Sequence, residues 1–209
     1  MKKNYLFEYI AFSLTLLIAV PGRLSYGLIL LVLFNLLMLS STAFKSLILL
    51  LNLKELKQVL TIIFLVFFTV VFRQCLILYS PVCALTLGFQ IYLPSLSSFI
   101  LGALFNENDE MNLVEQLEIN MKKSLTFSLY AFCIFILRDF LGYGSISFPV
   151  PRGVFELNIL HKTSFTFIGV FFASIPGALV LVSLSIILFA FFAKENLIAQ
   201  NTVEVFDDK

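Results

Sequence analysis

The sequence predicts an all-α integral membrane protein, with six transmembrane helices in one membrane domain that covers residues 1–209. First, 60% of its 209 residues are hydrophobic and only 13% are charged, against about 45–50% and about 25% in soluble domains. Second, six apolar runs are near or above the roughly 20 residues that a helix needs to cross a bilayer. Third, the loops between them are too short for a soluble catalytic domain. The formal net charge of +1 argues against nucleic acid as a partner and leaves the lipid bilayer as the expected surroundings.

The predicted spans cover residues 5–20, 25–51, 59–79, 83–105, 124–142 and 164–193. The second and sixth are longer than a bilayer requires, so we expect them to tilt or to project from it. Only two loops are sizeable, residues 106–123 and residues 143–163.

The distribution of Lys and Arg predicts that both termini are cytoplasmic, because loops on that side of a membrane are enriched in these residues. Nine lysines fall on the side of the N-terminus: Lys2, Lys3, Lys45, Lys54, Lys57, Lys122, Lys123, Lys194 and Lys209. The opposite side has Arg23, Arg73, Arg138, Arg152 and Lys162, two of them within spans.

Two interruptions indicate that the six spans form an inverted repeat of three plus three. The first span ends at Pro21-Gly22, and Pro94 interrupts the fourth within QIYLPSLSSFILGALF. Broken helices at matching places in two halves are typical of inverted-repeat membrane proteins. We therefore expect spans one and four to be broken and to meet near the bilayer centre. Proline is also common in membrane helices without any such role.

A charged pair follows the apolar run 125–137, in the segment FILRDFLGYGSISFPVPRG. Arg138 and Asp139 lie about one helical turn before Gly142, which places them near the outer end of span five. Adjacent residues on a helix do not face each other, so Arg138 can extend outward while Asp139 needs its own partner. Gly142 and Gly144 predict the helix end, because glycine tolerates positive φ.

Two interpretations of this pair stay open. The pair is a boundary anchor, or Asp139 is a packing lock for the 143–163 loop. In the second case its partners are backbone N–H groups of that loop and Arg152.

The run from Arg138 to Ser147 resembles the membrane subunits of the Rnf complex and of the Na⁺-translocating NADH:quinone reductase, the RnfA/RnfE and NqrD/NqrE family. That family carries Arg-Glu, two hydrophobic residues and Gly-x-Gly at the end of its fifth span. Four further segments are similar to family segments: LLIAV (16–20), RQCLILY (73–79) with Gln74, FILG (99–102), and IPGAL (175–179) with Pro176 and Gly177. The cytoplasmic termini are similar to those of RnfE and NqrD.

The resemblance implies a subunit of an ion-translocating electron-transport complex in the bacterial cytoplasmic (inner) membrane. It also implies an inverted partner subunit of the RnfA/NqrE type, with which the family shares one [2Fe-2S] cluster. The positions that match the family's two cysteine ligands are Thr15 and Ser98 here, and iron–sulfur clusters need thiolates. We therefore expect a divergent scaffold subunit that binds no cluster by itself, with Thr15 and Ser98 facing one central site.

No residue pattern predicts catalysis by this chain, so we expect at most a non-catalytic subunit of an oxidoreductase complex. His161 is the only histidine, and there is no phosphate-binding or dinucleotide-binding glycine motif. Cys75, Cys83 and Cys133 lie away from the implied ligand positions. By default we expect them to be buried as small apolar residues. A Cys75–Cys83 disulfide on the oxidising face is an open alternative.

The alternative function is a small-solute transport module, such as the substrate-capturing subunit of an energy-coupling-factor transporter. Those subunits meet their partner through an Ala-x-x-x-Ala face. Ala11 and Ala19 are eight residues apart in span one, so that face is absent there. A structural membrane protein without any coupling is the third candidate.

Overall fold

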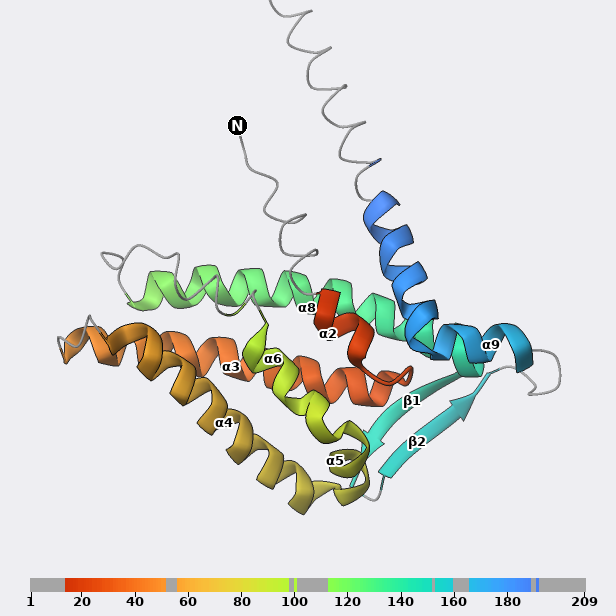
Figure 1. Cartoon of the computed structure of the whole chain (residues 1–209), viewed down its shortest axis with the longest axis horizontal. Coiled ribbons are helices and arrows are strands. Elements are labelled where there is room, and N and C mark those ends of the chain that lie inside the picture. Colours follow the sequence, from red (N-terminus) through yellow and green to blue (C-terminus); the bar gives the residue numbers. More distant parts are fainter. Residues whose placement is uncertain are drawn as a thin grey trace, which may run out of the picture.

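The computed structural model describes residues 14–51, 56–97, 100, 113–151, 153–159, 166–188 and 191. Figure 1 shows these parts as a mostly helical molecule with one small sheet. Within them, three helices are long and apolar enough to cross a membrane: α3 (Leu24–Leu50), α4 (Lys57–Tyr79) and α8 (Leu113–Tyr143). This agrees with a membrane protein.

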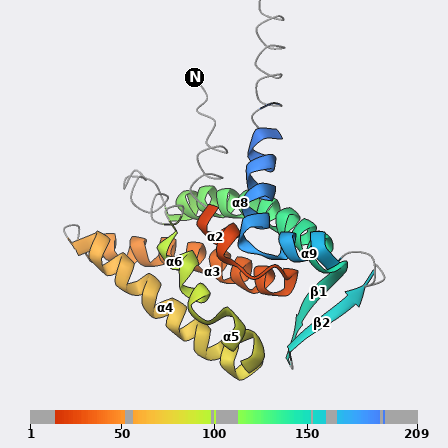
Figure 2. The ribbon, with the colours of Figure 1, turned by 45° about the vertical axis from the view of Figure 1, so that its right-hand side comes forward.

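Helices α3 and α8 pack side by side and form the centre of the fold (Figures 1 and 2). Their close approach depends on Gly27, where an added Cβ would lie 2.5 Å from the ring of Phe135. Helix α8 begins eleven residues before the predicted span, so residues 113–123, which we predicted to be loop, are helical instead. The reason is that this segment is rich in Leu, Glu, Gln, Met and Lys, which favour helix even where they are polar.

Short segments stand where the first and fourth spans were predicted. The described part of the first is α2 (Leu14–Ala19), which ends before the Pro21-Gly22 break. The fourth is divided into α5 (Pro81–Leu87), the 3₁₀ helix η2 (Gly88–Tyr92) and α6 (Leu93–Leu96). Helix α2 packs against α6 and α8.

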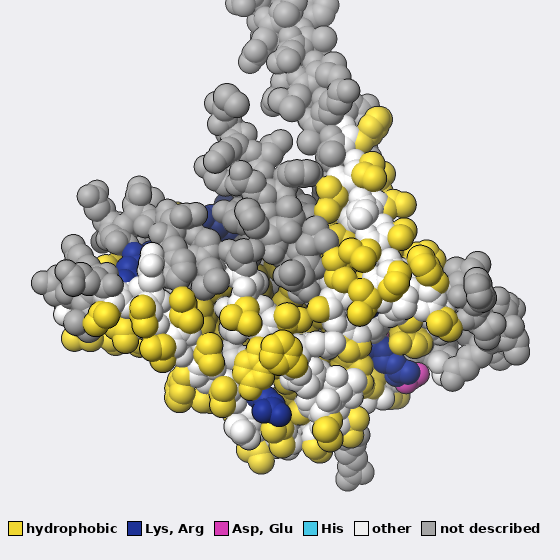
Figure 3. Space-filling model, in the orientation of Figure 1, with side chains coloured by type: hydrophobic (Ala, Val, Ile, Leu, Met, Phe, Trp, Pro, Cys, Tyr) yellow, Lys and Arg dark blue, Asp and Glu magenta, His cyan; other side chains and the backbone are white. Residues whose placement is uncertain are grey.

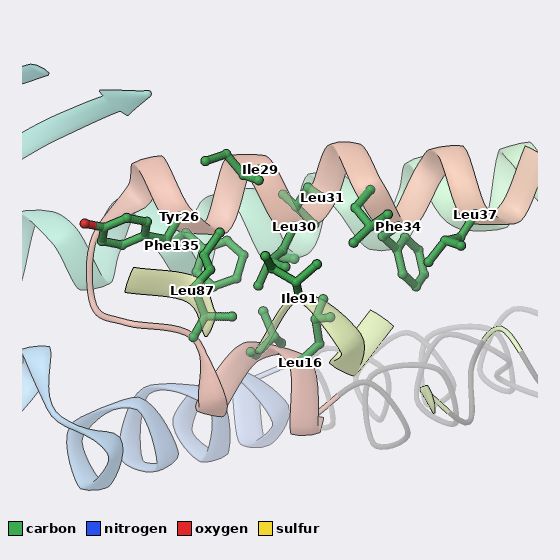
Figure 4. Close-up of a cluster of buried hydrophobic side chains, with 14 of the residues drawn as sticks. Leu16, Tyr26, Ile29, Leu30, Leu31, Phe34, Leu37, Leu87, Ile91 and Phe135 are labelled. Carbon is green, nitrogen blue, oxygen red and sulfur yellow. The ribbon is translucent and has the colours of Figure 1, made fainter. Parts of the chain in front are cut away.

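The hydrophobic core lies where these short segments meet the long pair. Figure 4 shows side chains from α2, α3, η2 and α8 converging there, among them Leu16, Leu30, Ile91 and Phe135. All four are almost completely buried. Burial of an aliphatic or aromatic side chain of this size from water is worth about 1.5–3 kcal/mol. In a bilayer the gain comes mainly from van der Waals packing.

The prediction of an all-α fold is wrong at residues 145–158. Strands β1 (Ser145–Val150) and β2 (Gly153–Asn158) form an antiparallel hairpin with Phe148 opposite Phe155. Polar and apolar residues alternate in Ser145–Phe148 and again in Phe155–Asn158, with the period of two that strands require. Most of the apolar residues of the hairpin are β-branched or aromatic. Our prediction treated residues 143–163 only as a loop and did not use this alternation.

The sixth predicted span is not one straight helix either. Helix α9 (Thr166–Ala173) ends at a bend at Ser174, and a second helix runs over Ile175–Leu188. Pro176 lies in the first turn of this second helix, where proline needs no backbone N–H partner. An added Cβ on Gly177 would lie 2.2 Å from the carbonyl oxygen of Phe171, so glycine permits the close approach of the backbone at the bend.

Candidate functional site: a buried Arg-Asp pair at three helix ends

Arg138 and Asp139 lie in the last turns of α8, and both are buried, with exposed fractions of 1% and 0%. The boundary interpretation allowed the guanidinium of Arg138 to extend outward, but it does not. It points into the protein, where the ends of α2 and α9 and the start of α3 converge.

Arg138 binds the last carbonyl groups of two short helices. One terminal nitrogen, Nη1, donates to the carbonyl oxygens of Val20 at 2.6 Å and Leu17 at 3.4 Å, at the end of α2. The other nitrogens donate to three carbonyl oxygens at the end of α9: Phe172 at 3.4 Å, Ala173 at 3.1 Å and Ser174 at 3.3 Å. The last carbonyls of a helix have no partner within it, and the C-terminal end attracts a cation. One planar guanidinium therefore caps both helices.

Asp139 caps the start of a third helix. Its Oδ2 atom accepts hydrogen bonds from the backbone N–H of Leu24 at 3.2 Å, in the first turn of α3, and from the N–H and hydroxyl of Ser147 in β1 at 2.7 and 2.6 Å. The Ser147 hydroxyl oxygen also accepts from the N–H of Ser25 at 3.1 Å. A carboxylate at a helix N-terminus stabilises the free N–H groups there.

The prediction that Asp139 binds a backbone N–H of the 143–163 loop is thus confirmed at Ser147. The contact with α3 was not foreseen. Arg152, the other predicted partner, lies outside the described residues.

Glycines allow the three helix ends to approach each other. An added Cβ on Gly22 would lie 2.8 Å from the carbonyl oxygen of Ala173, and one on Gly169 would lie 2.6 Å from that of Gly142. Gly142 lies inside α8, against Ala173, rather than ending the helix. Gly144, which follows the last helical residue, has a φ of 64°. Its N–H donates to the carbonyl oxygen of Phe140. The predicted helix end is therefore at Gly144.

The hairpin is attached to the helices at its middle, beside this site, and at its tip, by α5. In the middle, Arg23 forms an ion pair with Glu156, and its guanidinium lies 4.9 Å from the ring centre of Tyr143. Burial works to lower the pKa of Arg23, but the hydrogen bond and charge of Glu156, with a smaller contribution from Tyr143, raise it above its ordinary value. At the tip, the Cys83 thiol donates to the carbonyl oxygen of Gly153 at 3.5 Å.

A row of polar residues between α3 and α8 was missed by our sequence reasoning. Asn35 donates to the Ser128 hydroxyl at 2.8 Å and accepts from that of Ser124 at 2.6 Å, and Asn120 donates to Thr42 at 3.3 Å. The spacing of four between residues 120, 124 and 128 places them on one face of a helix and could have revealed the row. Such bonds between membrane helices contribute about 0.6 kcal/mol each on average. The row therefore adds a modest stabilisation to the packing of α3 against α8.

The implied iron–sulfur ligand positions do not fit a [2Fe-2S] cluster. They carry hydroxyl groups, which are poor ligands for this metal site. Ser98 and the side chain of Thr15 lie outside the described residues, so their convergence on one site stays a prediction. Cys83 is buried against the hairpin, Cys75 and Cys133 are exposed, and all three are free thiols. The described residues contain no group of three His, Cys, Asp or Glu side chains that could hold a metal.

An open apolar groove of about 330 Å³ lies between α3, α4 and the hairpin. Its lining is apolar except for Cys75 and Tyr79: Leu28, Ile29, Val32, Phe72, Cys75, Leu76, Tyr79 and Pro149. A polar solute, as the alternative transport function would require, would find few hydrogen-bonding groups there. Gln74 does not line this groove; its side chain is exposed on α4.

Comparisons with models of known protein families, with curated proteins and with solved structures give no match. Among the described residues, the feature on which a functional proposal can be built is the Arg138-Asp139 pair, which holds three helix ends and the hairpin together.

Proposed function

We propose that this chain is a membrane subunit of an ion-translocating electron-transport complex of the Rnf/Nqr type. In this proposal it is a scaffold that has lost its share of the [2Fe-2S] ligands. The observation that carries the proposal is the use made of the Arg-Asp-x-x-Gly-x-Gly segment, which resembles that family's. A motif whose charged pair caps α2, α3 and α9 serves to hold broken helices in place.

The finer architecture belongs to the same proposal. Six spans would form an inverted repeat of three plus three, with both termini on the cytoplasmic side of the bacterial inner membrane. The contact between α2 and α6 supports it, because the first and fourth spans of such a repeat meet at corresponding places. The partner would be an inverted paralogue of the RnfA/NqrE type.

The test is purification of the tagged chain from its native membranes in a mild detergent. We expect subunits that carry flavin and iron–sulfur groups to purify with it, together with a paralogue inserted the other way up. We expect the isolated chain to lack the visible absorption of a [2Fe-2S] cluster. The matched variant is Asp139→Leu, which should reduce recovery of the partners while the chain itself is still made. Purification of the wild-type chain alone, in a stable form, would contradict the proposal.

A further inference from the structure

Helix α4 presents an uncovered apolar face that runs along nearly its whole length. Only 22% of its most apolar stretch is buried, against 56% for α3 and 33% for α8. Figure 3 shows hydrophobic side chains along the part of the surface where α4 lies in Figure 1.

One line of residues on this face has the spacing of a helix-pairing seam. The line advances by alternating steps of four and three residues, the heptad pattern of helices that pack along each other. Its apolar members are all β-branched and 37–59% exposed. The line consists of Val59, Ile63, Val66, Val70, Arg73 and Ile77.

Arg73 is the one charged residue in that line, and none of the described residues pairs with it. It forms no hydrogen bond or ion pair with any other described residue, and its Nε atom is buried and unbonded. It lies six residues before the end of α4 at Tyr79, or about 9 Å along the helix. Ionisable groups at such depth in a membrane are costly and normally paired. At the depth of Arg73, the part of the chain that the structure describes therefore offers no anion on the apolar face of α4.

The position of Arg73 favours a carboxylate on another helix over a lipid phosphate. Side chains on a helix lean toward its N-terminus, which for α4 is the cytoplasmic end in the proposed orientation. A guanidinium that follows this tendency leans away from the nearer headgroups. A single polar residue in an apolar seam is also the usual means of fixing the register of two paired helices.

A second copy of this chain does not supply the carboxylate from the part that the structure describes. The acidic residues there are Glu115 and Glu118 in the polar first turns of α8, Glu156 in the hairpin, and Asp139. Asp139 is completely buried, and its Oδ2 atom already accepts hydrogen bonds inside the chain.

We propose that the α4 seam docks a transmembrane helix of another protein, and that an Asp or Glu of that helix pairs with Arg73. This proposal rests on the proposed function, because that function makes the chain a subunit with partners. It adds that the α4 seam meets a partner and that an ion pair with Arg73 joins the two.

The test uses the purified full chain in lipid vesicles with a fluorescent Leu/Ala peptide of about 20 residues, long enough to span the bilayer. The peptide carries one Asp at a third of its length. It is made once with the forward and once with the reversed sequence. An otherwise identical peptide carries Asn. Energy transfer from the chain to the peptide reports association.

We expect the Asp peptide to associate about tenfold more tightly than the Asn peptide, equivalent to about 1.4 kcal/mol. Arg73→Gln should abolish this preference, Arg73→Lys should retain part of it, and the control Lys122→Gln in α8 should leave it unchanged. Thermal unfolding of each variant verifies that the chain is folded.

Equal association of the Asp and Asn peptides would overturn the proposal, as would a preference that survives Arg73→Gln. An Arg73-dependent enrichment of labelled phosphatidylglycerol without any Asp preference would assign the face to lipid, and Arg73-dependent self-association would assign it to a second copy. Both outcomes contradict the docking of a different protein. Because the peptide assay uses the isolated chain, its failure is separate from a failure of the co-purification test.

Discussion

Replacing Arg138 with Met is the most direct test of the idea that one guanidinium holds two broken helices. Methionine is unbranched and of similar length, so it fills much of the same space without donating a hydrogen bond. The change leaves the carbonyl groups of Val20 and Ala173, the two closest acceptors at 2.6 and 3.1 Å, without their donor.

The expected loss follows from these two bonds. A buried polar group that loses its partner costs about 1–3 kcal/mol, so two carbonyl groups give about 2–6 kcal/mol. The three longer contacts, at 3.3–3.4 Å, contribute little. For a chain of this size each kcal/mol corresponds to about 2–4 °C in Tm. We expect the Tm in detergent to fall by roughly 4–24 °C.

Two variants make the test specific. Arg138→Lys keeps the charge but loses the planar fork, so it can serve one helix end well but not both, and an intermediate Tm is expected. Arg73→Met removes the same charge from a side chain without partners in the described structure, so it should leave the Tm of the isolated chain nearly unchanged. If Arg138→Met and Arg73→Met melt at the same temperature as the parent, the capping argument is refuted.

Three further substitutions test other parts of the site. Asp139→Asn can still accept the hydrogen bonds from Leu24 and Ser147 and should be mild, whereas Asp139→Leu should expose the hairpin to limited proteolysis; equal protection of both variants and the parent would show that Asp139 does not hold the hairpin in place. Gly22→Ala should lower the free energy of unfolding by about 1–3 kcal/mol, because the new Cβ would meet the Ala173 carbonyl oxygen at 2.8 Å; an unchanged denaturation midpoint would show that the helix ends separate easily. Glu156→Gln should cost at most about 1 kcal/mol, because both partners of the Arg23 ion pair are about a third exposed; the cost should shrink at high salt, and a large salt-independent loss would mean that Glu156 has another role.

The long apolar helices were predictable because hydropathy alone marks them. The sequence placed α3 and α4 within two residues of their observed ends. It also located the break after α2 from Pro21-Gly22 and the end of α8 near Gly144. These features depend on local properties: the apolar run needed to cross a membrane, the lack of an N–H on proline, and the freedom of glycine to adopt positive φ.

The Arg138-Asp139 site could be located in the sequence, but its partners could not be named. The carbonyl groups that Arg138 binds belong to Val20 and Ala173, which are 118 and 35 residues away, and backbone carbonyls carry no sequence signal. Whether this pair would face the boundary or the interior depended on the meeting of three helix ends, which is a property of the packing.

The sequence by itself determined that this chain belongs in a membrane, where its apolar runs lie, and which charged pair ends the fifth of them. Only the tertiary structure decided that the pair is buried, that Asp139 caps α3, and that Arg73 in the exposed α4 seam has no partner among the described residues. The reason is physical: hydrophobicity and backbone freedom are properties of single residues and short segments, whereas the pairing of a buried charge depends on which distant backbone groups the fold brings within about 3 Å of it.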